Sequence, residues 1–199
     1  MGRPTAPDSP RCGGAHGAPA RRLRRESRLA MEKPVPEAPP PIRVLMVCMG
    51  NICRSPTAEG VLRARLAAAG MAEWVLVDSA GTHAYHVGEP PDERSQAHAA
   101  RRGYDLSAQR ARAVDDDDFE RFDLLLAMDW DNLALLQERC PPQAQRKLRR
   151  LMEFGRAAGS EVVPDPYYGG AAGFDHVLDL VEAACDGLIE HLARTPGRE

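Results

Sequence analysis

Residues 44–60 read VLMVCMGNICRSPTAEG, and this stretch decides the fold. The apolar run that ends at Cys48 predicts a buried β-strand that begins at Ile42. The segment that starts with Ser55 and Pro56 predicts a helix that Gly70 ends, with Ser55 as its capping residue. A strand that runs through a short loop into a helix leaves Cys48 and Arg54 at the two ends of that loop.

The rest of the chain repeats this alternation of strands and helices. Further strands are predicted for residues 74–82, 122–129 and 147–154, and helices for residues 91–106, 130–140 and 174–194. Strands that alternate with helices indicate an α/β domain with a parallel sheet. In such sheets ligands bind beyond the carboxyl ends of the strands, and Cys48 lies at the first of these ends.

Composition and charge exclude several classes of protein. The chain of 199 residues has a net charge of −3, and residues 1–40, with eight basic and four acidic side chains, leave about −7 on the remainder. A domain this acidic is a poor general binder of nucleic acid, and no apolar run is long enough to span a membrane. The five scattered cysteines form no disulfide or zinc pattern and are typical of a reducing compartment. We therefore expect a cytoplasmic protein.

The ends of the chain differ from its centre. Residues 1–41 contain nine of the 17 prolines and the run RRLRRESR, so we expect a disordered Pro/Arg-rich tail. There are two alternatives to a disordered tail. The segment could be a basic arm that docks an acidic partner, or translation could begin at Met31. The predicted folded domain covers residues 42–195, and residues 196–199 are expected to be disordered.

The loop after the first strand has the chemistry of a tetrahedral-anion site. A strand-to-helix turn aims several backbone N–H groups at one point, and the helix dipole adds positive charge there. Gly50 allows close approach of the backbone, and Arg54 supplies a planar fork that matches two phosphate oxygens. Cys48 enters the same cradle, where its thiolate would be stabilised and placed for attack on phosphorus.

A carboxyl group for proton transfer comes from a second motif, VPDPYYGG at residues 163–170. Asp165 lies between two prolines in a long loop. We expect it to give a proton to the leaving oxygen and then to act as base toward water.

Together CMGNICRSPTAEG, DSAGT and DPYYGG resemble the low-molecular-weight protein tyrosine phosphatases, in the same order along residues 42–194. The resemblance implies a four-stranded parallel sheet with helices on both faces and no metal or cofactor. It implies Cys48 as nucleophile, Arg54 as phosphate clamp and Asp165 as general acid. It also implies that Ser55 stabilises the thiolate and that Asn51, tied to Ser79, holds the loop in an unusual backbone shape.

The predicted substrate pocket departs from the family in two places. Gln109 stands where the family often has a loop-supporting histidine, and Tyr85 replaces a frequent tryptophan in the pocket wall. Ile52 narrows the cradle, where the related protein-arginine phosphatases carry threonine, and so favours a flat phenolic ester. The complete set of predicted substrate-binding residues is Met49, Gly50, Asn51, Ile52, Cys53, Ser55, Tyr85, Tyr167 and Tyr168.

Other functions stay open at this point. A thioredoxin-coupled arsenate reductase resembles this loop but needs two further cysteines near residues 125–140, where only Cys140 is available. A non-catalytic phosphate-binding module is the second alternative. The expected partner is a phosphotyrosine-bearing protein, with a bacterial tyrosine kinase as one candidate, and the oligomeric state stays open.

Individual side chains have alternatives of their own. Cys53 either packs or forms a reversible disulfide with Cys48. Tyr167 and Tyr168 are pocket walls or kinase targets. The acidic run at residues 115–118 predicts an exposed helix start. We expect His83, His86 and His98 to be surface residues rather than metal ligands.

Overall fold

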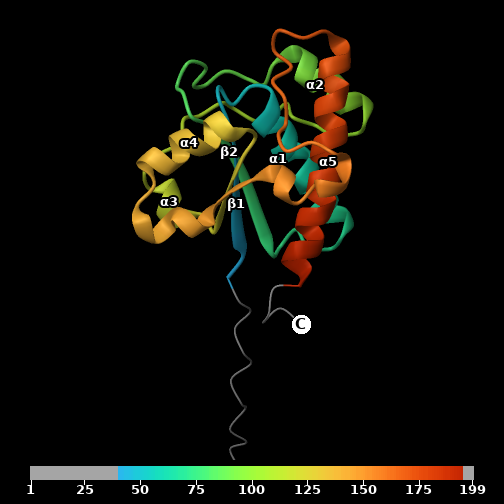
Figure 1. Ribbon diagram of the computed structural model, residues 1–199. Coiled ribbons are helices and arrows are strands. Elements are labelled where there is room, and N and C mark those ends of the chain that lie inside the picture. The colour runs from blue at the N-terminus through green and yellow to red at the C-terminus, as the bar shows by residue number, and fades with distance from the viewer. Residues whose placement is uncertain (1–39, 195–199) are drawn as a thin grey trace, which may run out of the picture. The chain divides into compact units, whose positions relative to one another are not determined.

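The computed structural model describes residues 40–194. The predicted tails therefore lie outside the described residues, except for residues 40 and 41, and both stay predictions. Four parallel strands form one sheet in the order β2–β1–β3–β4 (Figure 1). Their bounds are β1 Ile42–Cys48, β2 Val75–Gly81, β3 Leu124–Ala127 and β4 Leu148–Arg150.

Strand β1 is the centre of this sheet and determines where the site lies. It pairs along its whole length with β2, from Ile42 opposite Val75 to Cys48 opposite Gly81. On its other side it pairs with β3. The chain therefore leaves β1 in one direction for β2 and returns on the opposite side for β3. This reversal of strand order creates a crevice at the carboxyl ends, the position at which α/β sheets bind ligands.

Helices cover both faces of the sheet, as predicted. Helices α1 (Arg54–Ala68) and α5 (Ala171–Ala193) lie on one face, and α3 (Asp118–Arg121) and α4 (Trp130–Arg139) lie on the other (Figure 1). Helix α2 (Glu93–Arg101) packs against α5. Short 3₁₀ turns cover Pro142–Lys147, Leu151–Glu153 and Arg156–Ala158.

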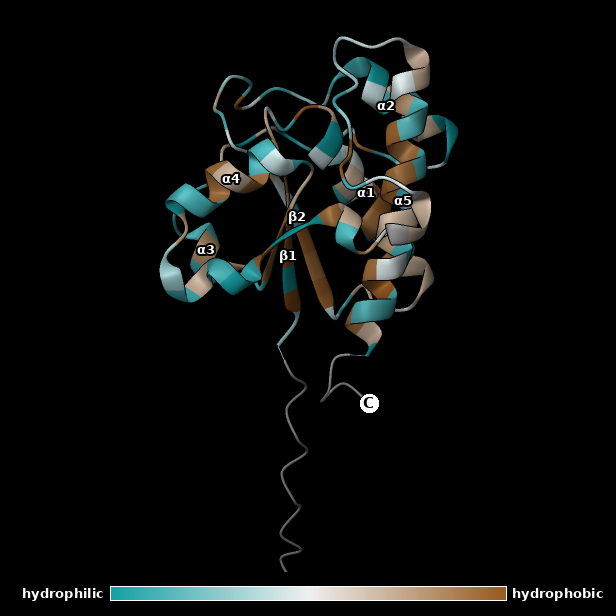
Figure 2. Ribbon diagram, in the orientation of Figure 1, coloured by the Kyte–Doolittle hydropathy of each residue, from teal (hydrophilic) through white to brown (hydrophobic). Residues whose placement is uncertain are grey.

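The alternation of side chains along β1 builds two hydrophobic cores. Val44 and Met46 join the core beneath α1 and α5, whereas Leu45 and Val47 join the core beneath α3 and α4. All four side chains are fully buried, as a strand covered on both faces requires. Figure 2 shows hydrophobic colours on much of β2 and on several turns of α5.

Several local expectations are wrong. The strand predicted for residues 147–154 is shorter, because β4 ends at Arg150 and a 3₁₀ turn follows over Leu151–Glu153. Helix α1 begins at Arg54 with Cys53 at its cap, so Ser55 does not cap it and is fully buried instead. Asp118 is fully buried rather than exposed, because its carboxylate pairs with Arg112 at 2.8 Å. His98 is buried in α2 rather than at the surface, and its ring nitrogen lies 2.7 Å from Asp175 of α5.

Among residues 40–194 no helix has both the length and the apolar content needed to cross a bilayer.

Candidate active site

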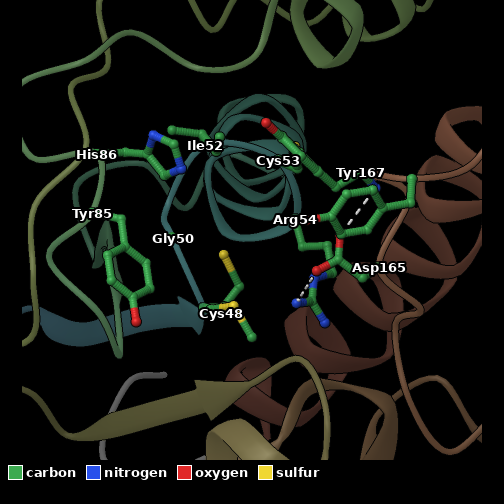
Figure 3. A pocket seen from close by; sticks show the side chains of 11 residues that line it. Cys48, Gly50, Ile52, Cys53, Arg54, Tyr85, His86, Asp165 and Tyr167 are labelled. Atoms are coloured by element: carbon green, nitrogen blue, oxygen red, sulfur yellow. Dashed lines mark hydrogen bonds and ion pairs between the residues drawn. The ribbon is translucent and has the colours of Figure 1, made fainter.

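The loop that joins β1 to α1, residues 48–55 and here called the anion loop, forms the floor of a cavity. The cavity measures about 260 Å³. Figure 3 shows Cys48 at the end of β1 with the side chains of Arg54, Asp165, Tyr85 and Tyr167 around the same space. The complete lining is Cys48, Met49, Gly50, Ile52, Cys53, Arg54, Tyr85, His86, Asp165, Tyr167 and Tyr168.

Beneath the anion loop, a chain of buried hydroxyl and amide groups leads away from the thiol. Cys48 Sγ lies 3.0 Å from Ser55 Oγ. Asn51 Nδ2 donates to Ser55 Oγ and to Ser79 Oγ, each at 2.9 Å. Asn51 adopts a left-handed backbone conformation with φ of 56°, which asparagine tolerates better than most residues. The loop shape expected for Asn51 and its bond to Ser79 are therefore both present.

Further hydrogen bonds hold these hydroxyl and amide groups in place. Ser79 Oγ donates to Glu59 Oε2 at 2.5 Å, and Asn51 Oδ1 accepts from the backbone N–H of Arg112 at 2.9 Å. Burial raises the pKa of Glu59 above its ordinary value, although the Ser79 hydroxyl and the neighbouring Arg63 act in the opposite direction. The asparagine amide thus uses its donor and acceptor atoms at once, which fixes its orientation.

Gly81 at the end of β2 allows the loops to approach one another closely. A Cβ atom at this position would lie 2.6 Å from the carbonyl oxygen of Met49 and 2.9 Å from that of His83. Both neighbours are backbone atoms, so neither can rotate away. Backbone bonds from Thr82 to Cys48 and from His83 to Met49 tie this segment to the anion loop.

The guanidinium of Arg54 is the main charged group beside the thiol. It lies 2.5 Å from Asp129 and 2.8 Å from Asp165, and it also donates to the carbonyl of Val163 at 3.3 Å. Burial by itself lowers the pKa of Arg54, but the neighbouring Cys48 and the two carboxylates oppose this effect and raise it above its ordinary value. The positive charge of Arg54 is therefore permanent.

The segment of residues 161–170, here called the acid loop, carries Asp165 over the cavity. Asp165 Oδ1 accepts from the backbone N–H of Tyr167 at 3.0 Å while its Oδ2 faces Arg54. Arg94 of α2 donates to the carbonyl of Tyr167 at 3.0 Å and lies over its ring. The carboxylate is 43 % exposed, so it can meet both a substrate and water.

Aromatic side chains form the cavity walls. Tyr85 stacks on His83 with ring centroids 5.1 Å apart, and Tyr167 meets Tyr168 edge to face at 5.0 Å. Tyr168 is 97 % exposed, so it projects from the rim rather than packing inside. Ile52 is buried and lines the cavity.

The predicted residues divide into two groups. The three predicted catalytic residues and all three tyrosines line the cavity, whereas Asn51, Ser55 and Ser79 support the loop from below. The supporting residue Gln109 donates from Nε2 to the carbonyl of Pro56 at 3.1 Å. Its Oε1 is buried with no hydrogen-bond partner in the described part of the chain.

Two site residues are not in the predicted set. Asp129 pairs with Arg54, and its place directly after a buried strand at the carboxyl edge was a usable signal. His86 lies against Gly50 in the cavity wall and contacts Glu89 at 2.7 Å. No motif distinguishes His86 from a surface histidine.

The other cysteines have different environments. Burial raises the pKa of Cys53 to about 12, so this thiol keeps its proton at neutral pH. Cys140 and Cys185 are buried and do not line the cavity, whereas Cys12 lies outside the described residues. Within residues 40–194, no group of three or more histidine, cysteine, aspartate or glutamate side chains is arranged to hold a metal ion.

The fold and the site define an α/β protein that presents a cysteine, an arginine and an aspartate around one anion-sized loop. The chain belongs to the low molecular weight phosphotyrosine protein phosphatase family, because the sequence model of that family matches residues 43–197. This membership confirms the predicted family and enzyme class, and the sheet confirms the predicted fold.

Individual relatives support this assignment. The chain is 45 % identical over 150 residues to a low molecular weight protein-tyrosine-phosphatase of Streptomyces coelicolor, a match that covers 74 % of this chain and 91 % of that protein. It is similar to a protein tyrosine phosphatase of Entamoeba histolytica solved with Hepes in the active site, with a TM-score of 0.75, 41 % identity, and coverage of 76 % and 97 %. Wzb of Vibrio vulnificus, solved with benzylphosphonate, gives a TM-score of 0.66 and 28 % identity, with coverage of 75 % and 98 %.

Proposed function

We propose that this protein hydrolyses phosphotyrosine in proteins through a cysteinyl-phosphate intermediate. Cys48 is the nucleophile, Arg54 the phosphate clamp and Asp165 the general acid and base. The observation that carries this proposal is the convergence of these three side chains on one cavity whose floor is the anion loop. No cofactor is needed for this chemistry.

The first step transfers the phosphoryl group to sulfur. The phosphate of the substrate occupies the anion loop, where backbone N–H groups and the dipole of α1 face it. There it competes with Asp129 and Asp165 for the guanidinium of Arg54. The thiolate of Cys48 forms a bond to phosphorus while the bond from phosphorus to the tyrosine oxygen breaks. Asp165 gives its proton to that oxygen, so a neutral tyrosine leaves.

The second step hydrolyses the intermediate. Asp165, now a carboxylate, takes a proton from a water molecule whose oxygen bonds to phosphorus. The bond from phosphorus to sulfur breaks and returns the electron pair to Cys48, which leaves as a thiolate. The hydroxyl of Ser55, 3.0 Å from the sulfur, donates a hydrogen bond that stabilises this leaving group. Inorganic phosphate then leaves and the enzyme is restored.

The walls favour an aromatic ester. Tyr85 and Tyr167 flank the cavity, and Ile52 narrows its floor, so a flat ring can reach the sulfur. Benzylphosphonate, the ligand in the related Wzb structure, is also a phosphorus anion on an aromatic group. We propose that a phosphotyrosine-bearing protein is the partner, that a tyrosine kinase is one such substrate, and that the protein acts in the cytoplasm.

Hydrolysis of p-nitrophenyl phosphate tests this assignment. We expect Cys48→Ser to lower kcat by at least about 10⁴-fold and Asp165→Ala by about 10²-fold to 10⁴-fold. Asp186→Ala, which removes another half-exposed aspartate paired with an arginine, is the matched control and should leave kcat unchanged.

Each alternative has its own outcome. Full activity in Cys48→Ser would rule out the covalent mechanism. Arsenate-dependent thiol oxidation without phosphatase activity would favour a reductase. Phosphate binding without any hydrolysis would indicate a non-catalytic module.

A further inference from the structure

Three consecutive residues that follow β3 each contact a different part of the site. The carbonyl of Met128 accepts from the backbone N–H of Val163 at 2.8 Å. Asp129 pairs with Arg54 at 2.5 Å. The indole of Trp130 lies beneath the guanidinium of Arg150, 3.5 Å from its ring centroid. Met128 contacts the acid loop directly, at Val163, and Trp130 contacts it through Arg150.

Arg150, at the end of β4, is itself held in place. It lies opposite Ala127 in the sheet, and its backbone N–H donates to Glu153 Oε1 at 2.9 Å. From this position its Nη1 donates to the carbonyl of Glu161 at 2.6 Å and lies 3.7 Å from the Glu161 carboxylate. Its Nε is buried with no hydrogen-bond partner among the described residues, so the stacked position is kept even though one donor stays unpaired.

The contact at Glu161 lies close to the reacting groups along the chain. Glu161 is two residues before Val163 and four before Asp165. Val163 is fully buried, its N–H bonded to Met128 and its carbonyl to Arg54. Four residues of restrained backbone therefore join the contact of Arg150 to the carboxylate of Asp165.

We propose that Arg150, stacked on Trp130, is a positioning residue that sets the reach of Asp165 toward the leaving oxygen. This inference rests on the proposed role of Asp165 as general acid. A planar guanidinium can stack on an indole through its face and donate to a carbonyl through its edge. A lysine ammonium has no planar face to stack on the indole. Proton transfer depends steeply on position, so loss of this contact lowers the rate without removing the acid.

Leaving-group dependence provides the test. Phenol, with a pKa near 10 like that of tyrosine, needs protonation as it leaves far more than p-nitrophenol does. We expect Arg150→Met to lower kcat/KM by about threefold to tenfold for phenyl phosphate and by less than about twofold for p-nitrophenyl phosphate. In the Asp165→Ala background, Arg150→Met should cause no further loss on phenyl phosphate, because the group it positions is absent.

Two further variants keep the test decisive. Arg146→Met makes the same chemical change at an exposed arginine whose guanidinium donates to the carbonyl of Gln143 rather than to the acid loop, and should not alter the ratio of the two substrates. Trp130→Leu removes the half-exposed ring on which Arg150 stacks. It should lower kcat/KM for phenyl phosphate more than for p-nitrophenyl phosphate, by a smaller factor than Arg150→Met does. It therefore provides the test if Arg150→Met does not fold.

The outcomes separate this inference from the proposed function. Equal losses on both substrates, or the same loss with and without Asp165, overturn the positioning role while the wild-type protein stays active. A wild-type protein that hydrolyses neither ester overturns both.

Discussion

The anion loop and the acid loop face one cavity but are built in opposite ways. Asn51 and Ser55 of the anion loop are buried, and the Asn51 amide donates to the hydroxyls of both Ser55 and Ser79. The acid loop carries a half-exposed Asp165 and an almost fully exposed Tyr168. The anion loop, proposed to bind the phosphate, is held by buried side-chain hydrogen bonds, whereas the acid loop, proposed to meet the substrate protein, exposes its side chains. Substitutions in the two loops should therefore differ in kind.

The largest effect on stability is expected at Asn51. Asn51→Ala leaves buried polar partners unpaired and places a Cβ-bearing residue without a polar side chain at φ of 56°. We expect the free energy of unfolding to fall by about 2–4 kcal/mol and kcat on p-nitrophenyl phosphate by about tenfold to a hundredfold. Urea unfolding and steady-state kinetics measure the two quantities.

Asn51→Gly separates the two causes. Glycine tolerates the left-handed conformation but also loses the hydrogen bonds, so it should be about 1 kcal/mol more stable than the alanine variant. Equal stabilities would show that backbone strain contributes nothing here.

A smaller effect is expected at Glu59, which supports the anion loop through Ser79. Because burial raises the pKa of Glu59 in the folded state, that state binds the proton more tightly than the unfolded chain does. The resulting stabilisation is complete below the unfolded pKa and is lost as the pH rises through the folded pKa. Glu59→Gln removes this titration but keeps an acceptor for the Ser79 hydroxyl.

The difference in unfolding free energy, wild type minus Glu59→Gln, should therefore fall as the pH rises from about 4 toward 8. Its slope cannot exceed about 1.4 kcal/mol per pH unit, because one proton is involved. Urea unfolding at each pH measures it. Parallel pH profiles for the two proteins would contradict the burial argument.

The smallest effect is expected at Tyr168 on the acid loop. Tyr168→Ala removes an exposed ring that contacts Tyr167, so the unfolding free energy should change by less than about 0.5 kcal/mol and kcat on p-nitrophenyl phosphate by less than about threefold. Phosphotyrosine peptides, which extend over the rim, should show a rise in KM. A loss of stability as large as that of Asn51→Ala would remove the contrast between the loops.

The sequence predicts the anion loop well because its information is local. Strand, loop and helix follow one another within residues 42–70, and the flanking prolines mark Asp165 in the same way. The role of Ser55 was harder to assign, since a serine at a helix start ordinarily caps it. Here the Ser55 hydroxyl is hydrogen-bonded to the Cys48 thiol and the Asn51 amide instead of a backbone N–H of the helix.

Contacts between distant segments were beyond prediction from this single sequence. The place of Asp129 directly after a buried strand marks it as a candidate site residue, but it lies 75 residues from Arg54 and no local pattern pairs the two. The acidic run at residues 115–118 predicts an exposed helix start, yet Asp118 turns inward because Arg112 meets it there. The stack of Arg150 on Trp130 likewise depends on β3 and β4 being neighbours in the sheet.

Gly81 has a practical consequence for altering which esters the protein accepts. With Met49 and His83 carbonyls less than 3 Å from where a methyl group would sit, this point tolerates no added bulk. A mutant library aimed at new specificity should therefore leave the floor untouched and vary the rim, where Tyr85 and Tyr168 are largely free of packing. Selectivity can then be redesigned without changing the loop that is proposed to bind phosphate.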